Sequence, residues 1–336
     1  MFETNNRDII ALQMQVVNEV TGAWKSQVMY TLLKLGVFDL LEKSGCDAKT
    51  IAKHLNVPEE SLERLVNCGV SIGYLTKKDK IYSNSDLAHT VLVSGKSGNL
   101  VNWLLLCARW YDSFGKLYRA VRTNEAVENI NYDDDTAYKE IFIKGMIDYA
   151  EYRGSDILNF LKLQGKERLL DVGTGPAIYP AMFVANYPDL KVTCADLSHA
   201  LEVAKRYLAD KKGKERIDFL VCDYKEIDSF GTDYDVVFMS HILHQEDEKM
   251  CRKIIEKGYR ALKPGGQLVV QAMFPDEMGA NTYTLLHDLL SLLIFPGGKN
   301  HSVPDTIQWM QDAGLKNVHY RKMSLFNINS LVVGEK

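Results

Sequence analysis

Three acidic side chains end three successive apolar runs of this sequence. They are Asp171, Asp196, which Leu197 follows, and Asp223, which Tyr224 follows. Each run predicts a buried strand, and ligands of open α/β sheets bind beyond the carboxyl ends of the strands. Carboxylates there suit an ammonium group, a ribose diol and an adenine amino group, the last beside an aromatic ring. These residues predict a polar cradle for a ligand with an amino-acid head, a ribose and an adenine.

The turn after Asp171 contains two glycines that favour a nucleotide-type ligand. Gly173 and Gly175 let a ligand approach the backbone closely. A dinucleotide fingerprint requires a further glycine three residues after Gly175, where the helix packs close to the strand and faces a pyrophosphate. Ile178 holds that position. The turn therefore favours an ammonium-bearing ligand over a pyrophosphate.

A histidine that follows a fourth apolar run is a candidate general base. Residues 234–240 predict a strand, and His244 comes just past its carboxyl end, on the ligand side of the sheet. A positioned base typically contributes roughly 10²- to 10⁴-fold to a rate. His241, three residues earlier, is the competing candidate. His287 and His301 lack an acid–histidine set at ligand spacing, so we predict no metal site and expect both at the surface or rim.

Length and composition are those of a globular protein with room for two domains. The chain has 336 residues, of which 46% are hydrophobic and 25% charged, and a formal net charge of -4. This charge gives no electrostatic reason to expect a nucleic acid as partner. Six scattered cysteines without a C-x-x-C pair predict reduced thiols in a cytoplasmic protein. A signal-peptide pattern and an apolar run of 18 residues are both lacking, so we expect no membrane partner.

The N-terminal third of the sequence predicts helices with alternative roles. Residues 8–41 carry apolar side chains at helical spacing, which either pack on their own domain or form a dimer interface. Residues 47–93 predict a helix, a turn, a second helix and a short hairpin, the order of a winged-helix module. Such a module suggests a DNA-binding regulator. The second helix, at 59–72, has three glutamates in its first five residues, which phosphates would repel; this favours a dimerisation scaffold.

Two further helical segments carry aromatic side chains. The segment around Trp103 is apolar and aromatic, and residues 137–160 place Phe142, Met146 and Tyr149 on one face of a helix. Plain core packing accounts for most such rings. An aromatic-lined cavity is also what a flat apolar substrate requires, so these side chains are candidates for a substrate pocket.

Together, these features resemble one enzyme family. The acidic turn, the strand ends, the aromatic helix face and the winged-helix-like start resemble class I S-adenosylmethionine-dependent small-molecule O-methyltransferases with an N-terminal winged-helix dimerisation domain. That group includes caffeic acid and hydroxyindole enzymes and bacterial tailoring enzymes. The resemblance covers nearly the whole chain and implies an α/β fold, with a doubly wound Rossmann-like sheet and a mostly helical winged-helix-like N-terminal domain. It also implies a homodimer, with a dimerisation domain at 1–100, linking helices at 101–160 and a cofactor-binding domain at 161–336.

The resemblance further implies a reaction and its residues. The reaction is methyl transfer from S-adenosylmethionine, with S-adenosylhomocysteine as product, to a hydroxyl of a planar, largely apolar molecule such as a phenolic or polyketide-like secondary metabolite. His244 matches the catalytic base. The implied cofactor residues are Asp171, Gly173, Gly175, Asp196, Leu197, Asp223, Tyr224 and Ser240. The implied substrate residues are Trp103, Phe142, Met146, Tyr149, Leu290, Ser291 and Phe295.

Four positions depart from the family pattern. Gln271 and Asn300 stand where two glutamates flank the histidine, Gln245 replaces an aspartate, and Ser240 replaces a lysine. A histidine without a carboxylate partner is a weaker base. Three explanations are open: an acceptor acidic enough to arrive deprotonated, methyl transfer to carbon or nitrogen, or amides that orient the ring. The alternatives to O-methylation are a C-methyltransferase, for example on tetrapyrroles, a non-methylating relative, and a cofactor-responsive DNA-binding regulator.

Overall fold

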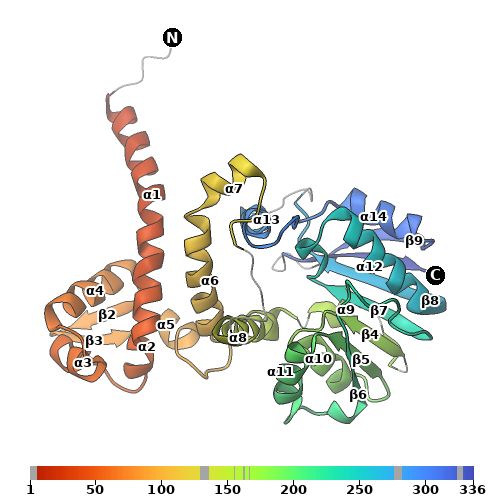
Figure 1. Ribbon diagram of the computed structural model, residues 1–336. Coiled ribbons are helices and arrows are strands. Elements are labelled where there is room, and N and C mark those ends of the chain that lie inside the picture. Colours follow the sequence, from red (N-terminus) through yellow and green to blue (C-terminus); the bar gives the residue numbers. More distant parts are fainter. Residues whose placement is uncertain are drawn as a thin grey trace. The chain divides into compact units, whose positions relative to one another are not determined.

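Two compact units make up the chain, residues 1–108 and 109–336 (Figure 1). The structure, a computed structural model, describes residues 6–128, 136–154, 156–161, 163–165, 167–275, 282–323 and 328–336. Within these ranges, no helix combines the length and the apolar character that a membrane span needs.

The N-terminal unit consists of helices around a small antiparallel sheet of order β1-β3-β2. Asp47 caps α3 by accepting a hydrogen bond from the Thr50 N–H at 2.7 Å, and Gly73 ends α4 with a φ of 94°. Helix, turn, helix and hairpin follow one another in the order that the sequence predicts for residues 47–93. The elements are α1 (Asn6–Leu35), α2 (Val37–Leu40), β1 (Cys46–Asp47), α3 (Ala48–Leu55), α4 (Glu59–Ile72), β2 (Leu75–Lys78), β3 (Ile81–Asn84) and α5 (Asp86–Val91), followed by α6 (Val101–Phe114), which crosses the boundary between the units.

The core of the N-terminal unit includes only the C-terminal part of α1. Leu32 and Leu33 are buried there with side chains from α3, α4 and β3. The N-terminal part of α1 extends beyond the helices around it within this unit (Figure 1). Its apolar side chains are each at least 41% exposed: Ile9, Ile10, Leu12, Met14, Val16, Val17, Val20 and Trp24. The unit by itself leaves this stripe uncovered.

The C-terminal unit is built on a seven-stranded sheet of order β6-β5-β4-β7-β8-β10-β9. Its strands are β4 (Arg168–Val172), β5 (Lys191–Asp196), β6 (Ile217–Val221), β7 (Tyr234–Ser240), β8 (Leu262–Ala272), β9 (Lys316–Lys322) and β10 (Ser330–Glu335). Its helices are α7 (Leu117–Thr123), α8 (Thr136–Arg153), α9 (Asp156–Leu161), α10 (Ile178–Asn186), α11 (Ser198–Leu208), η1 (Lys214–Arg216), η2 (Leu243–Gln245), α12 (Glu248–Ala261), α13 (Thr282–Ile294) and α14 (Val303–Asp312).

The strand order marks the end of β4 as the position where a sheet of this kind binds ligands. Strands β6, β5, β4, β7 and β8 are parallel, and β10 is antiparallel to β8 and β9. The chain builds outward from β4 in one direction through β5 and β6, and then in the other direction through β7 and β8. Such a reversal is the point where open α/β sheets bind ligands, beyond the carboxyl ends of the strands. The doubly wound sheet predicted from the sequence is confirmed.

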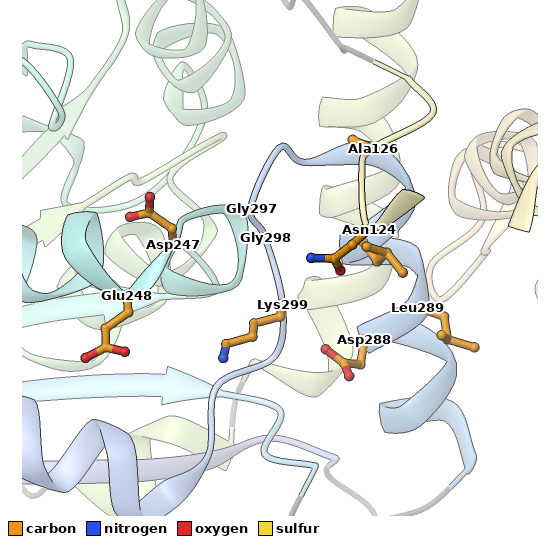
Figure 2. Close-up of a pocket in the computed structure, with 10 residues that line it drawn as sticks. Asn124, Ala126, Asp247, Glu248, Asp288, Leu289, Gly297, Gly298 and Lys299 are labelled. Atoms are coloured by element: carbon orange, nitrogen blue, oxygen red, sulfur yellow. The ribbon is translucent and has the colours of Figure 1, made fainter. Parts of the chain in front are cut away.

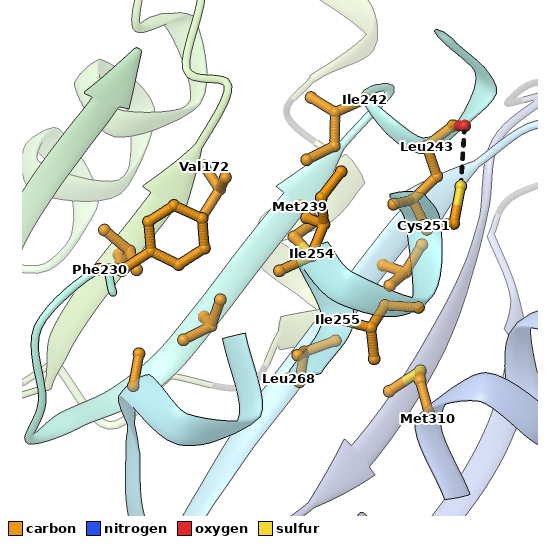
Figure 3. Packing of buried hydrophobic residues seen from close by; sticks show 14 of the residues in the cluster. Val172, Phe230, Met239, Ile242, Leu243, Cys251, Ile254, Ile255, Leu268 and Met310 are labelled. Atoms are coloured by element: carbon orange, nitrogen blue, oxygen red, sulfur yellow. Dashed lines mark hydrogen bonds between the residues drawn. The ribbon is translucent and has the colours of Figure 1, made fainter. Parts of the chain in front are cut away.

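Both faces of the central strands are covered, which explains the apolar runs in β4 and β7. Val237 and Met239 of β7 pack with α12 and α14 on one face (Figure 3), while Val236 and Phe238 pack with α10 and α11 on the other. Alternate residues of a strand point to opposite faces, so a doubly covered strand forms a nearly continuous apolar run. The packed layers fix the loops at the strand ends, where the acidic residues lie.

Candidate active site

The turn between β4 and α10 leaves empty space beside the backbone at one position. Gly173 and Gly175 have φ values of 69° and 55°, and α10 begins at Ile178. A side chain added at Gly173 would collide with Cγ2 of Ile242, whereas nothing lies within 4 Å of the corresponding position at Gly175. Gly173 therefore serves the packing of the turn against the loop after β7. Gly175 leaves space in which a ligand can reach the backbone.

Asp171 lies in this turn as a buried carboxyl group with one unused oxygen. Its Oδ2 accepts a hydrogen bond from Thr174 Oγ1 at 2.6 Å, and its Oδ1 has no hydrogen-bond partner among the described residues. Burial raises the pKa of Asp171 to about 7, against the opposing hydrogen bond from Thr174. A cation that donates to Oδ1 would give this oxygen a partner, and it would also stabilise the ionised form of the buried carboxyl group. The site fits an ammonium group.

The predicted acids at the ends of β4, β5 and β6 lie together. Asp196 accepts hydrogen bonds from the Gly175 N–H at 2.8 Å and from the Leu197 N–H at 2.7 Å. Burial raises the pKa of Asp196, and the negative charge of Asp223 raises it further. Asp196 in turn raises the pKa of Asp171. The sequence therefore correctly predicts that the three carboxyl groups form one cluster.

Tyr224 is held by residues that the sequence analysis did not single out. Its hydroxyl donates to Glu246 Oε1 at 2.9 Å, and this carboxylate is 2.8 Å from Lys225 Nζ. Lys257 Nζ donates to the Tyr224 carbonyl oxygen at 2.9 Å. Lys257 is a buried lysine on the apolar face of α12. A lysine at an apolar position of a helix is a signal in the sequence that could have identified this residue. These contacts fix the loop after β6 beside Asp223.

A second polar group connects Ser240 to α10. Ser240 Oγ donates to Gln271 Oε1 at 3.3 Å, and Gln271 Nε2 donates to the hydroxyl of Tyr179 at 3.1 Å. Tyr149 of α8 also acts electrostatically on Tyr179, whose pKa burial raises to about 12. The structure thereby connects the predicted cofactor residue Ser240 through Gln271 to Tyr179 of α10. Tyr179 was missed because it lies within an apolar helix.

His244 stands in a cluster of aromatic side chains. Its ring centroid is 6.1 Å from that of His241, 4.9 Å from that of His287 and 5.7 Å from that of Phe295. Burial lowers the pKa of His244 well below its ordinary value, and His287, His241 and His301 lower it further. Burial likewise lowers the pKa of His241 to about 4. Both rings are neutral near pH 7, so each has a lone pair that can accept a proton.

The expectation that His287 and His301 lie at the surface or rim is wrong for His301, whereas His287 is partly exposed. His301 is 5% exposed, and its Nε2 is 3.1 Å from the carbonyl oxygen of Leu243 and 3.0 Å from that of Glu246. His287 lies beside His244, and its Nδ1 is 3.1 Å from Asn300 Oδ1. Helix α13 packs against η2, and this contact between distant segments brings His287 to His244.

The two amides at the positions of the family's glutamates do not hold His244. Gln271 is engaged by Ser240 and Tyr179, and Asn300 by His287 and by the carbonyl oxygen of Thr284. Within the described residues, neither amide hydrogen-bonds to the ring of His244. Direct orientation of this ring by an amide, one of the three explanations left open by the sequence, has no support in the structure.

The predicted substrate residues are distributed over three places. Leu290 and Ser291 are buried in α13, where Ser291 Oγ donates to the carbonyl oxygen of His287 at 3.1 Å. Phe142, on the same helix as Met146 and Tyr149, stacks on Tyr138 at 6.0 Å between centroids. Trp103 belongs to the N-terminal unit. Phe295 is the predicted pocket residue that lies in ring contact with His244.

A hollow outside this cluster is lined by other residues. It has a volume of about 360 Å³ (Figure 2). None of the predicted site residues lines it. The lining of the hollow consists of Asn124, Ala126, Asp247, Glu248, Asp288, Leu289, Leu292, Gly297, Gly298 and Lys299.

Among the described residues, no group of three or more histidines, cysteines and acids is arranged to hold a metal ion.

Comparison with known proteins assigns this arrangement to a family. The family model of the O-methyltransferase domain matches residues 114–316. The chain belongs to the O-methyltransferase family. The model of the O-methyltransferase dimerisation domain matches residues 17–94 of this O-methyltransferase.

Similar proteins cover almost the whole O-methyltransferase chain. The 3-hydroxy-5-methyl-1-naphthoate 3-O-methyltransferase of Streptomyces sahachiroi is 26% identical, over 94% of this chain and 93% of that protein. The acetylserotonin O-methyltransferase of Bos taurus is 25% identical, over 90% and 92%. The structure of the mitomycin 7-O-methyltransferase has a TM-score of 0.89 at 22% identity and covers 99% of this chain and 100% of that one. The structure of human N-acetylserotonin methyltransferase in complex with S-adenosylmethionine has a TM-score of 0.85 at 21% identity, with 100% and 99% covered.

Proposed function

We propose that this O-methyltransferase transfers a methyl group from S-adenosylmethionine to a hydroxyl of a planar, largely apolar aromatic or polyketide-like molecule. The observation that carries the proposal is the buried, unpartnered Oδ1 of Asp171 in the cluster with Asp196 and Asp223. The family match supports the reaction, and the relatives named for naphthoate and acetylserotonin support the acceptor class. S-adenosylmethionine supplies a methyl group bonded to a positively charged sulfur.

The cofactor residues of this proposal follow the order of the strands. Asp171 takes the ammonium group, and the open space at Gly175 admits the amino-acid part to the backbone. Asp196 with Leu197 binds the ribose. Asp223 and Tyr224 bind the adenine, and Ser240 lies on the side of the cradle that faces β8, with Gln271. Gly173 shapes the turn through its contact with Ile242.

The acceptor side of the proposal is centred on His244. Its neutral ring accepts the proton of the acceptor hydroxyl, and Phe295 beside it supplies an apolar wall. Burial lowers its pKa and makes it a weak base, so acceptors with acidic hydroxyls react best. The remaining pocket residues that we propose are Trp103, Phe142, Met146, Tyr149, Leu290 and Ser291.

We also propose that the enzyme is a homodimer formed through its N-terminal domain, without nucleic acid or membrane as partner. The match to the dimerisation domain and the exposed apolar stripe of α1 support this assembly. A cytoplasmic location, which the sequence predicts, fits six cysteines that are all free thiols. The domain limits of 1–100, 101–160 and 161–336 remain a prediction.

Substitution of the two neighbouring histidines tests the role of His244. We expect His244→Ala to lower the rate of methyl transfer about 100-fold or more, since a positioned base contributes roughly 10²- to 10⁴-fold. His241→Ala is the matched control and is expected to lose less than tenfold. The rate is measured with methyl-labelled S-adenosylmethionine and N-acetylserotonin or a hydroxynaphthoate, and the methylated atom is identified by NMR. A loss below tenfold for His244→Ala would refute the base role, and a C-methylated product would refute O-methylation.

A further inference from the structure

His287 lies between the proposed base and an amide that fixes it. Its ring is 4.9 Å from that of His244 between centroids, with the planes at 79°, and its Nδ1 is 3.1 Å from Asn300 Oδ1. The backbone N–H of Asn300 donates to Asp288 Oδ1 at 2.6 Å. His287 is thus held by a residue that is itself fixed.

The hydrogen bonds of Asn300 define which nitrogen of His287 carries the hydrogen. Asn300 Nδ2 donates to the carbonyl oxygen of Thr284 at 3.1 Å, so the amide oxygen is the atom that faces His287. An amide oxygen only accepts hydrogen bonds, and Nδ1 of His287 must therefore be the donor. The lone pair of the neutral His287 ring is then on Nε2.

The two rings are in edge-to-face contact and are not hydrogen-bonded to each other in the described structure, but their separation is one at which a bond from His244 to that lone pair can form. Two imidazoles joined by an N–H···N bond of ordinary length have centroids about 5 Å apart, and the observed separation is 4.9 Å. Nε2 of His301 faces the carbonyl oxygens of Leu243 and Glu246, and its Nδ1 has no hydrogen-bond partner among the described residues, but its ring packs on Trp309, 4.8 Å away between centroids. Among the described histidine ring contacts of His244, that of His287 is the shortest, at 4.9 Å against 6.1 Å for His241.

We propose that His287 does for His244 what an acidic partner does in a histidine–carboxylate pair. When the acceptor O–H bond breaks, one ring nitrogen of His244 gains the proton and the acceptor oxygen keeps the electron pair. The other ring nitrogen of His244 then donates to Nε2 of His287, and Asn300 keeps His287 in the required tautomer. His287 is a positioning residue, and this inference rests on the proposed role of His244 as the base.

His287 can support a protonated His244 only while His287 itself is neutral. Protonated His287 would repel a proton on His244, as His241 and His301 also would. Burial lowers the pKa of His287, against Asn300 and Asp288, which raise it. His287 is therefore neutral near pH 7 and available as an acceptor, and its removal takes support away from the protonated His244.

The tautomer of His287 can be measured without any acceptor molecule. In the full-length protein labelled with ¹⁵N-histidine, with S-adenosylhomocysteine added, we expect the ¹⁵N shifts of His287 at pH 7.5 to show hydrogen on Nδ1. His287→Phe identifies its signals, and His319→Phe, at an exposed ring on β9, is the control. A neutral His287 with hydrogen on Nε2 would overturn the proposal, whether or not methyl transfer has been detected.

Kinetics of two His287 variants test the contribution to catalysis. We expect His287→Phe, which keeps a ring in the packing, to lower kcat about tenfold or more while the KM for the acceptor changes less than threefold. His287→Gln retains an amide oxygen as acceptor and is expected to recover most of kcat. Unchanged kcat in His287→Phe would overturn the proposal. Failure of the proposed function would appear differently, as equal rates for wild type and His244→Ala or as no methyl transfer by the wild type.

Discussion

Asp171 shows how a single residue can prepare the site for a positive charge. The carboxyl group is 1% exposed, and burial, the largest influence, raises its pKa to about 7. An unpaired buried polar atom costs roughly 1–3 kcal/mol. The protein without ligand therefore bears a cost that a bound ammonium group removes, and this difference favours the cofactor over neutral analogues.

Asp171→Asn should make the ligand-free protein less sensitive to alkaline pH. The folded pKa is above the unfolded value of about 3.9, so the folded protein binds this proton more tightly, and stability falls as pH rises from about 4 to about 7. The fall is on the order of 4 kcal/mol and is absent when an amide replaces the carboxyl group. Thermal unfolding at pH 5 and pH 8 should show a smaller decrease in Tm for Asp171→Asn than for wild type. The exposed Asp218→Asn is the control, and equal decreases in all three proteins would contradict the account.

Residue types at strand ends were predictable, whereas contacts between distant loops were not. Asp171, Asp196 and Asp223 each follow an apolar run, and parallel strands bring such ends to one edge. His287 reaches His244 only because α13 packs on η2. That contact depends on the path of a segment far along the chain, and helical spacing alone does not reveal it.

At the scale of elements, the turn from β4 to α10 separates packing from binding. Gly173 and Gly175 both have positive φ, but a side chain meets Ile242 only at Gly173. The helix and strand bounds around this turn follow from apolar runs and breakers in the sequence. The surroundings of each glycine follow from the loop after β7, which the sequence does not place.

Alanine at the two glycines should therefore have different effects. Each substitution costs roughly 1–2 kcal/mol for the left-handed backbone, and Gly173→Ala adds a collision with Ile242. We expect the Tm of Gly173→Ala to fall further than that of Gly175→Ala, while Gly175→Ala folds and binds S-adenosylhomocysteine at least tenfold more weakly. Thermal unfolding and calorimetry of both variants measure these effects. Equal Tm values with unchanged affinity at Gly175 would show that the open space there is not used.

At the scale of the whole molecule, the uncovered stripe of α1 predicts a second chain. Apolar side chains at this density seldom remain exposed in a monomer, and the stripe runs into the match to the dimerisation domain, which begins at residue 17. We expect light scattering to give twice the chain mass of 38.1 kDa. The double variant Val16→Glu and Val20→Glu should shift the enzyme towards monomer, and Lys211→Glu, in the C-terminal unit, should not. A monomeric wild type at micromolar concentration would contradict the assembly.

Calorimetric titration with S-adenosylhomocysteine tests the central claim most directly, because every site assignment depends on the acidic cluster at the ends of β4, β5 and β6. We predict saturable micromolar binding with one site per chain, weakened at least tenfold by Asp196→Ala and unchanged by Asp218→Ala on β6. The absence of binding at high micromolar concentration, or equal affinities for the wild type and Asp196→Ala, would contradict the account.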